Sequence, residues 1–181
     1  MRFLKNEELG RKSKEDFMLN DKIPVTLILD NVRSGSNVGS VFRTSDAFAI
    51  EMICLCGITA VPPEREILKT ALGATETVFW KHYTITEEAI QELKFNGYVV
   101  FAVEQSDSSL ALDQLDQLGS ESKIALIFGN EVKGVDEKLI PLLDGCIEVP
   151  QAGTKHSLNV SVCVGIVLWE FFKLFHKKRE P

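Results

Sequence analysis

The stretch IEVPQAGTKHSLNVSVCVGIVLWEFFKL, residues 147–174, decides the fold. It begins as a short apolar strand, turns at residues 150–153, and continues as a helical pattern with Ser157 as the expected N-cap, since a serine hydroxyl can pair with a free N–H of the first turn. Residues 158–169 carry no charge, and their apolar side chains fall on every face of the helical wheel. Such a helix is normally buried on all sides. Amides and hydroxyls nevertheless cluster at its mouth, which a ligand or a second subunit would explain.

Length and composition predict a single globular domain. The chain has 181 residues, of which 45% are hydrophobic and 25% charged. Residues 1–20 are charged throughout and lack the apolar centre of a signal peptide, and Asn159 and Ser161 interrupt the apolar helix too early for a membrane span, so we expect a cytoplasmic protein. The four cysteines follow no paired CxxC spacing, which favours buried thiols over a metal site; they are Cys54, Cys56, Cys146 and Cys163.

Charge is unevenly distributed along the chain. The net charge is -6, yet residues 1–14 carry five basic against two acidic side chains and residues 173–181 carry four against one. Basic ends on an acidic body could hold a polyanion at the edges of the fold, although solvated termini explain the charge equally well.

Apolar runs alternate with helical patterns from residue 24 onward. A helix over residues 3–18, which Gly10 weakens, precedes them. This alternation predicts an α/β fold with a mainly parallel sheet and helices on both faces. We expect strands at 24–30, 51–56, 77–80, 98–103, 123–128 and from 147, and helices near 38–48, 64–72, 87–95, 137–142 and from 157.

Ligands of parallel sheets bind beyond the carboxyl ends of the strands, so the loops after Leu29, Val103, Phe128 and Val149 are the places to search. The first of these is rich in Asn, Ser and Gly and leads into a helix with Asn37 at its mouth. Small residues there let a phosphate or a ribose approach the backbone N–H groups. Arg43 would lie one turn in, although from this segment alone a surface salt bridge is the favoured explanation of this arginine.

The loop after the strand at 123–128 reads GNEVKG, residues 129–134. Its two glycines allow a positive φ or a close backbone approach. No Lys-Ser/Thr pair follows, which excludes a P-loop, and a plain turn with Glu131 and Lys133 in solvent remains an alternative. His156 precedes Ser157 without a glycine-flanked serine elbow, which disfavours a hydrolase.

Three segments in this order carry a resemblance to a known family. NVRSGSNVGSVFRTSDAF (31–48), IALIFGNEVKGV (124–135) and IEVPQAGTKHSLNVSVCVGIVLWE (147–170) resemble the motifs of the SpoU, or TrmH, family of RNA ribose 2'-O-methyltransferases, which belongs to the SPOUT class. ITAVPPEREILKTALGATETVFW (58–80) is similar to the linking region of that family. The resemblance spans about residues 24–172.

This resemblance implies a C-terminal deep trefoil knot that binds S-adenosyl-L-methionine, and a homodimer that completes the active site. The last helix would then be apolar all round because it packs in the knot on one side and against the partner on the other. We accordingly expect a SpoU methyltransferase domain at 24–176. The apolar pattern predicts an N-terminal helical extension at 1–23, and the charge distribution predicts a basic tail at 177–181. No metal is implied.

Residue roles follow from the same resemblance. Arg43 matches the catalytic arginine; because guanidinium has a pKa above about 12 and is a poor base, we expect it to position and polarise the ribose hydroxyl and a phosphate. Holding both reactants in line supplies on the order of 7–11 kcal/mol of the barrier. The matching polar residues are Asn37, Glu131, Ser157 and Asn159, and the expected cofactor-binding residues are Val103, Glu104, Gly129, Val149, Ser157 and Leu158.

The substrate implied is RNA, and we favour tRNA over rRNA. Only 23 residues precede the first expected strand, so RNA would be held by the basic ends and by cations near the site, which are Arg33, Arg65, Lys69, Lys133 and Lys155. Two alternatives stay open. One is a catalytically silent relative that acts as an RNA chaperone or assembly factor; the other is a dinucleotide-binding α/β protein, which the glycine spacing of SGSNVG disfavours.

Overall fold

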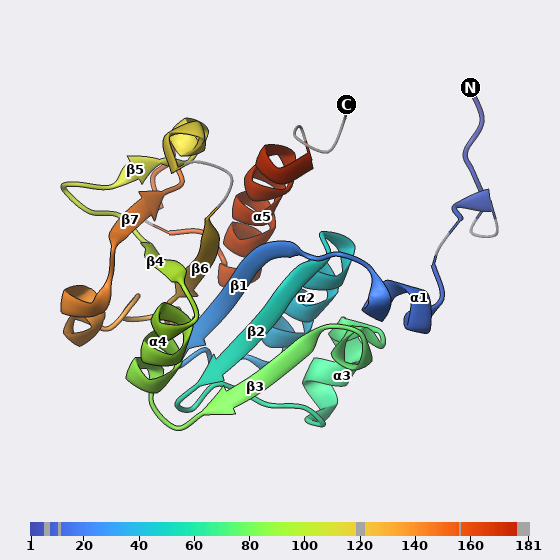
Figure 1. Cartoon of the computed structure of the whole chain (residues 1–181), viewed down its shortest axis with the longest axis horizontal. Coiled ribbons are helices and arrows are strands. Elements are labelled where there is room, and N and C mark those ends of the chain that lie inside the picture. The colour runs from blue at the N-terminus through green and yellow to red at the C-terminus, as the bar shows by residue number, and fades with distance from the viewer. Residues whose placement is uncertain (6–7, 11, 119–121, 156, 177–181) are drawn as a thin grey trace.

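The computed structural model describes residues 1–5, 8–10, 12–118, 122–155 and 157–176. Within them a seven-stranded sheet has the order β3-β2-β1-β6-β4-β7-β5, and every neighbouring pair is parallel. Figure 1 shows β1 near its centre. The strands are β1 (Ile23–Asp30), β2 (Ile50–Cys56), β3 (Phe79–Tyr83), β4 (Tyr98–Val103), β5 (Leu110–Ala111), β6 (Lys123–Phe128) and β7 (Gly145–Glu148).

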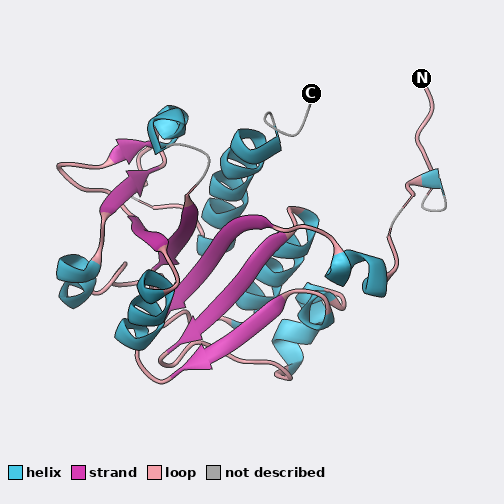
Figure 2. Ribbon diagram, viewed as in Figure 1, coloured by secondary structure: helices cyan, strands magenta, loops and turns pink. Residues whose placement is uncertain are grey.

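Helices cover both faces of this sheet, as Figure 2 shows. One buried cluster lies under α2, α3 and α5, and a second lies under α4 and η4. No helix in the described ranges is both long and apolar enough to cross a membrane. The α-helices are α1 (Lys14–Leu19), α2 (Gly35–Ala47), α3 (Arg65–Ala71), α4 (Thr86–Phe95) and α5 (Val160–His176), and the 3-10 helices are η2 (Ala74–Glu76), η3 (Leu112–Leu118) and η4 (Glu137–Leu142).

The predicted parallel α/β architecture is confirmed, and the expected strands lie close to the observed ones. The central strands are apolar runs because both of their faces are covered; in β1 every residue from Val25 to Asp30 is buried. The helix predicted over residues 3–18 is wrong in extent. Among the described residues the α-helix there is α1, at Lys14–Leu19. Gly10 has φ 56°, and Phe3 is 90% exposed, so this apolar side chain is not covered. Residues 6, 7 and 11 lie outside the described part.

The last helix begins three residues later than predicted. Ser157 is not its N-cap, because the helix starts at Val160 and Asn159 caps it: the Asn159 Oδ1 accepts from the Ser161 N–H at 3.0 Å. The expected burial on all sides is also wrong for the single chain. Val162, Ile166 and Trp169 are 51%, 38% and 49% exposed, so one apolar side of α5 faces solvent.

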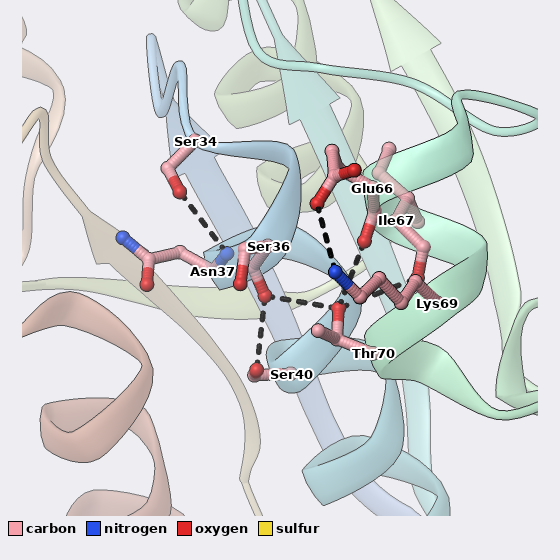
Figure 3. A network of polar contacts seen from close by, with 8 residues as sticks. All are labelled: Ser34, Ser36, Asn37, Ser40, Glu66, Ile67, Lys69 and Thr70. Carbon is pink, nitrogen blue, oxygen red and sulfur yellow. Dashed lines mark hydrogen bonds and ion pairs between the residues drawn. The ribbon is translucent and has the colours of Figure 1, made fainter.

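Helix α2 packs closely on α3, and this contact orients its polar face. A Cβ on Gly39 would lie 2.1 Å from the Thr70 Oγ1 and 2.3 Å from the Ile67 carbonyl oxygen, so only glycine fits there. The Thr70 hydroxyl bridges the helices by donating to the Ser36 carbonyl at 3.1 Å. Figure 3 shows that the Asn37 side chain consequently points away from α3.

Candidate active site

Three segments that are distant in sequence meet at Asn37. The Asn37 Nδ2 donates to the Glu131 Oε1 at 2.9 Å, and the Asn37 Oδ1 accepts from the Asn159 Nδ2 at 3.2 Å. These contacts join α2, the loop after β6 and the start of α5. The carboxyl ends of parallel strands share one edge of a sheet, which explains why loops so far apart in the chain converge there.

Helix caps hold two of the three residues in place. The Ser34 hydroxyl accepts from the Asn37 N–H at 3.3 Å, which fixes the first turn of α2. The Asn159 Oδ1 accepts from both the N–H and the hydroxyl of Ser161, at 3.0 and 2.7 Å. Asn159 therefore uses its carbonyl oxygen as a helix cap and its amide nitrogen to reach Asn37.

The loop of residues 129–134, which we call the GNE loop, is closed on itself. Asn130 and Gly134 exchange backbone hydrogen bonds of 3.1 and 2.8 Å, and Gly134 has φ 70°. A Cβ on Gly129 would lie 2.1 Å from the carbonyl carbon of Gly134, so the close backbone approach expected from the two glycines is confirmed. The Asn130 side chain also donates to the Asn31 carbonyl at 2.8 Å, which ties the GNE loop to the loop after β1.

A cavity of about 300 Å³ opens between the GNE loop and the start of α5; we call it the β6 cavity. It combines apolar walls with two carboxylates, several amides and backbone groups, as small-molecule sites do. Of the expected cofactor-binding residues, five line it and Val149 does not; Val149 lines a different cavity with Pro150 and Ile166. The lining is Val103, Glu104, Gln105, Phe128, Gly129, Asn130, Glu131, Val132, Lys133, Gly134, Gln151, Ser157, Leu158, Val160 and Cys163.

Arg43 lies apart from this cavity. It is exposed, makes no hydrogen bond or ion pair with the described residues, and lines another cavity together with Lys12, Lys14 and Leu72. Six residues separate it from Asn37, which corresponds to about 9 Å along α2 and about 120° around it. Within one chain the structure thus brings Asn37, Glu131, Ser157 and Asn159 to one place and leaves Arg43 on the α3 side of the same helix.

Two thiols border the site and are weakly acidic. Burial raises the pKa of Cys163, which lines the β6 cavity, to about 11, and the Glu104 carboxylate adds to the shift. Burial likewise raises the pKa of Cys146, whose Sγ donates to the Glu104 carbonyl at 3.1 Å. These protonated thiols suit packing, not nucleophilic attack.

The sequence prediction missed part of the site. Asn130 shapes the GNE loop by accepting from the Val132 N–H at 2.9 Å, and its place beside Glu131 in the motif was the available signal. Cys163 and Val160 also line the β6 cavity, and a helix start placed correctly at residue 160 would have put both on its first turn. His156 lies outside the described residues.

Comparison with known proteins shows the family. The model of the SpoU rRNA Methylase family matches residues 24–169. A tRNA (guanosine(18)-2'-O)-methyltransferase of Thermus thermophilus is 29% identical over 164 residues, which are 90% of this chain and 81% of that protein. A putative TrmH family tRNA/rRNA methyltransferase of Staphylococcus aureus is 28% identical over 154 residues; the match covers 85% of this chain but only 60% of the relative.

Solved structures share the fold. The A. aeolicus TrmH/SpoU tRNA modifying enzyme superposes with a TM-score of 0.80 at 23% identity, over 92% of this chain and 82% of that one. The AdoMet-bound rRNA methyltransferase of Sinorhizobium meliloti superposes with a TM-score of 0.77 at 27% identity, over 84% of this chain and 57% of that one.

Proposed function

Because the chain belongs to the SpoU methylase family, we propose that it transfers a methyl group from S-adenosyl-L-methionine to a ribose 2'-hydroxyl of RNA. The observation that carries the proposal is the hydrogen-bonded series Glu131–Asn37–Asn159, which joins one polar residue from each of the three motifs beside the β6 cavity. The Thermus thermophilus relative supports tRNA over rRNA, since the match covers 81% of that protein.

The β6 cavity suits the cofactor. Leu158 and Val160 offer apolar contacts to a purine, and the Glu104 carboxylate can accept from hydroxyl or ammonium groups. A Cβ at position 134 would lie 2.5 Å from the Glu104 Oε2, so glycine keeps room for this carboxylate at the cavity wall. S-adenosylmethionine supplies an activated methyl group on its sulfonium. The protein's share is to hold that methyl in line with the ribose oxygen and to exclude water, and it needs no metal.

The polar series would hold the ribose. Asn37 is hydrogen-bonded to Glu131, which lines the β6 cavity, and Asn159 lies between the lining residues Leu158 and Val160; Ser157 also lines it. Within one chain Arg43 lies on the other flank of α2, away from the β6 cavity. In the proposed homodimer the partner subunit's Arg43 would bind an RNA phosphate and polarise the target hydroxyl. The proton finally leaves to solvent or phosphate, because guanidinium itself is too weak a base.

The proposal includes a homodimer. A side of α5 with three half-exposed apolar residues, Val162, Ile166 and Trp169, is the support, because such a stripe on a helix is normally covered. The trefoil knot and the cytoplasmic location that the resemblance implies belong to the proposal as well. Sedimentation of Trp169→Glu tests the dimer: the variant should be monomeric, and an unchanged mass would reject this interface.

Methyl transfer to RNA tests the activity. Purified protein is incubated with methyl-labelled cofactor and with bulk tRNA or rRNA from cells that lack the gene. Label should enter tRNA and survive in alkali-resistant dinucleotides, because a 2'-O-methyl group blocks alkaline cleavage. Arg43→Ala should lower the rate about 100-fold or more while the cofactor Kd stays constant. Lys123→Ala, at the exposed amino end of β6, is the control.

Two outcomes would reject the proposal. Undiminished transfer by Arg43→Ala would remove that residue from the mechanism. No transfer to any RNA, with cofactor binding intact, would favour the silent RNA-binding alternative.

A further inference from the structure

A second cavity, of about 820 Å³, lies across the GNE loop from the β6 cavity. We call it the β1 cavity, because its floor is the carboxyl end of β1. Asn130, Lys133 and Gly134 are among the residues that line both cavities, so the GNE loop is the wall between them. The lining is Asp30, Asn31, Arg33, Ile58, Asn130, Val132, Lys133, Gly134, Val135, Asp136, Glu137 and Lys138.

The cations of the β1 cavity are free and most of its carboxylates are engaged. Arg33, Lys133 and Lys138 are exposed and form no ion pair with any described residue. Asp30 is only 2% exposed and accepts from the Thr86 hydroxyl at 2.5 Å and the Asn31 Nδ2 at 2.9 Å. Of the other two acidic residues, Asp136 is engaged as the cap of η4, because it accepts from the Lys138 N–H at 3.0 Å, and only Glu137 is exposed at the rim without such a role.

Apolar side chains stand exposed beside these cations. Ile58, after β2, is 59% exposed, and Val132, at the tip of the GNE loop, is 89% exposed. Cations next to exposed apolar surface fit single-stranded nucleic acid, whose phosphates need positive charge and whose bases need apolar contact. A folded protein partner is disfavoured because this surface is concave and its two exposed aliphatic residues, Ile58 and Val132, are flanked by charge.

We propose that the β1 cavity binds the RNA strand next to the target nucleotide, with Arg33 and Lys138 on its phosphates and Val132 and Ile58 against a base. This site rests on the proposed function and extends it. The Asn31–Asn130 hydrogen bond holds the two loops together, so a strand that places its ribose at Asn37 can continue over the GNE loop into the β1 cavity. It would set which sequence or bend beside the target is accepted.

The decisive variant is Arg33→Gln/Lys138→Gln, because both residues line the β1 cavity and neither lines the β6 cavity. Its control, Lys81→Gln/Lys123→Gln, removes the same charge from β3 and from the amino end of β6, and neither residue lines the β6 cavity or the β1 cavity. The full-length protein is titrated with unmodified bulk tRNA by filter binding between about 50 and about 300 mM salt, and separately with S-adenosylmethionine by calorimetry.

The variant should bind tRNA about 10-fold more weakly, and the slope of log K against log salt should flatten by about 1.5, since each lost phosphate contact removes about 0.7–0.9. In the control, the changes in tRNA affinity and in salt slope should each be less than about a third of those in the variant. The variant and the control should both keep the wild-type Kd for the cofactor. Glu137→Gln should tighten tRNA binding, because it removes a carboxylate from the rim of the cavity.

An unchanged slope and affinity in Arg33→Gln/Lys138→Gln, with the cofactor bound normally, would overturn this assignment. Such a result would leave the proposed function intact if the wild type still methylates RNA. Failure of the wild type to bind or methylate RNA would instead reject the proposed function itself.

Discussion

The hydrogen bond from Asn37 to Glu131, which joins α2 to the GNE loop, can be tested by substituting first one partner and then both. In Asn37→Asp the new carboxylate still accepts from Asn159, but it can no longer donate to Glu131. Two like charges 2.9 Å apart repel by about 1.4 kcal/mol even at the dielectric constant of water, and the lost hydrogen bond to a carboxylate contributes about 1.5 kcal/mol more. The contact between α2 and the GNE loop should therefore be weakened by about 3 kcal/mol.

Cofactor affinity reports this release, because the GNE loop is a wall of the β6 cavity. Calorimetric titration with S-adenosylmethionine should give a Kd at least 10-fold higher for Asn37→Asp. Hydrogen exchange of the amides of residues 130–134 should quicken in parallel.

The double variant Asn37→Asp/Glu131→Gln restores the pair in reversed polarity, since the glutamine amide can donate to the aspartate. Its Kd should return to within about threefold of wild type, and Glu131→Gln alone should have a small effect because the Gln carbonyl still accepts from Asn37. Wild-type affinity in Asn37→Asp, or no recovery in the double variant, would refute the reasoning.

Three further outcomes follow from the structure. Gly129→Ala should lower the free energy of unfolding by about 2–4 kcal/mol in a urea titration, because its Cβ would meet the backbone of Gly134 and Val135 at 2.1–2.2 Å, whereas Gly153→Ala, with nothing nearer than 4.0 Å, should not. Cys163, with its pKa raised to about 11 by burial, should react slowly with maleimides at pH 8, and bound S-adenosylmethionine should slow it further; a fast, unprotected reaction would place the thiol outside the cavity. Burial alone would raise the pKa of Asp144, but hydrogen bonds from Lys94 and the Val100 N–H hold this pKa below its usual range. The stability that the ionised Asp144 contributes is therefore present above its unfolded-state pKa and is lost as pH falls through its folded-state pKa. Asp144→Asn should weaken the loss of unfolding free energy at acid pH, and an unchanged dependence of that free energy on pH would contradict this.

The central strands were predictable because burial on both faces demands uninterrupted apolar runs, and such runs stand out in the sequence. β5 was not, since Leu110–Ala111 is too short to show a pattern. The N-terminal helix failed for a related reason: apolar residues such as Phe3 and Leu4 predict a helix only if another surface covers them, and here both are exposed. The strand order depends on contacts between distant segments, which periodicity does not contain.

The sequence predicted which residues form the polar site but not how they are arranged. Motif order identified Asn37, Glu131 and Asn159, which the structure joins by hydrogen bonds. Helical spacing alone already puts Arg43 about 120° around α2 from Asn37, so a single shared pocket for both was not to be expected within one chain. The shift of the last helix start from Ser157 to Val160 arose because two residues at that turn are good caps, and only the fold selects Asn159.

Asn159 serves two ends with one amide group: its oxygen starts α5 and its nitrogen reaches Asn37. Most substitutions at this position would therefore remove both contacts at once. Such a substitution would lose the helix cap together with the proposed substrate contact, so a saturation screen for activity and one for abundance should both penalise the position. Asn159→Asp would separate the two contacts, since it keeps the oxygen that caps α5 and removes the N–H donor to Asn37.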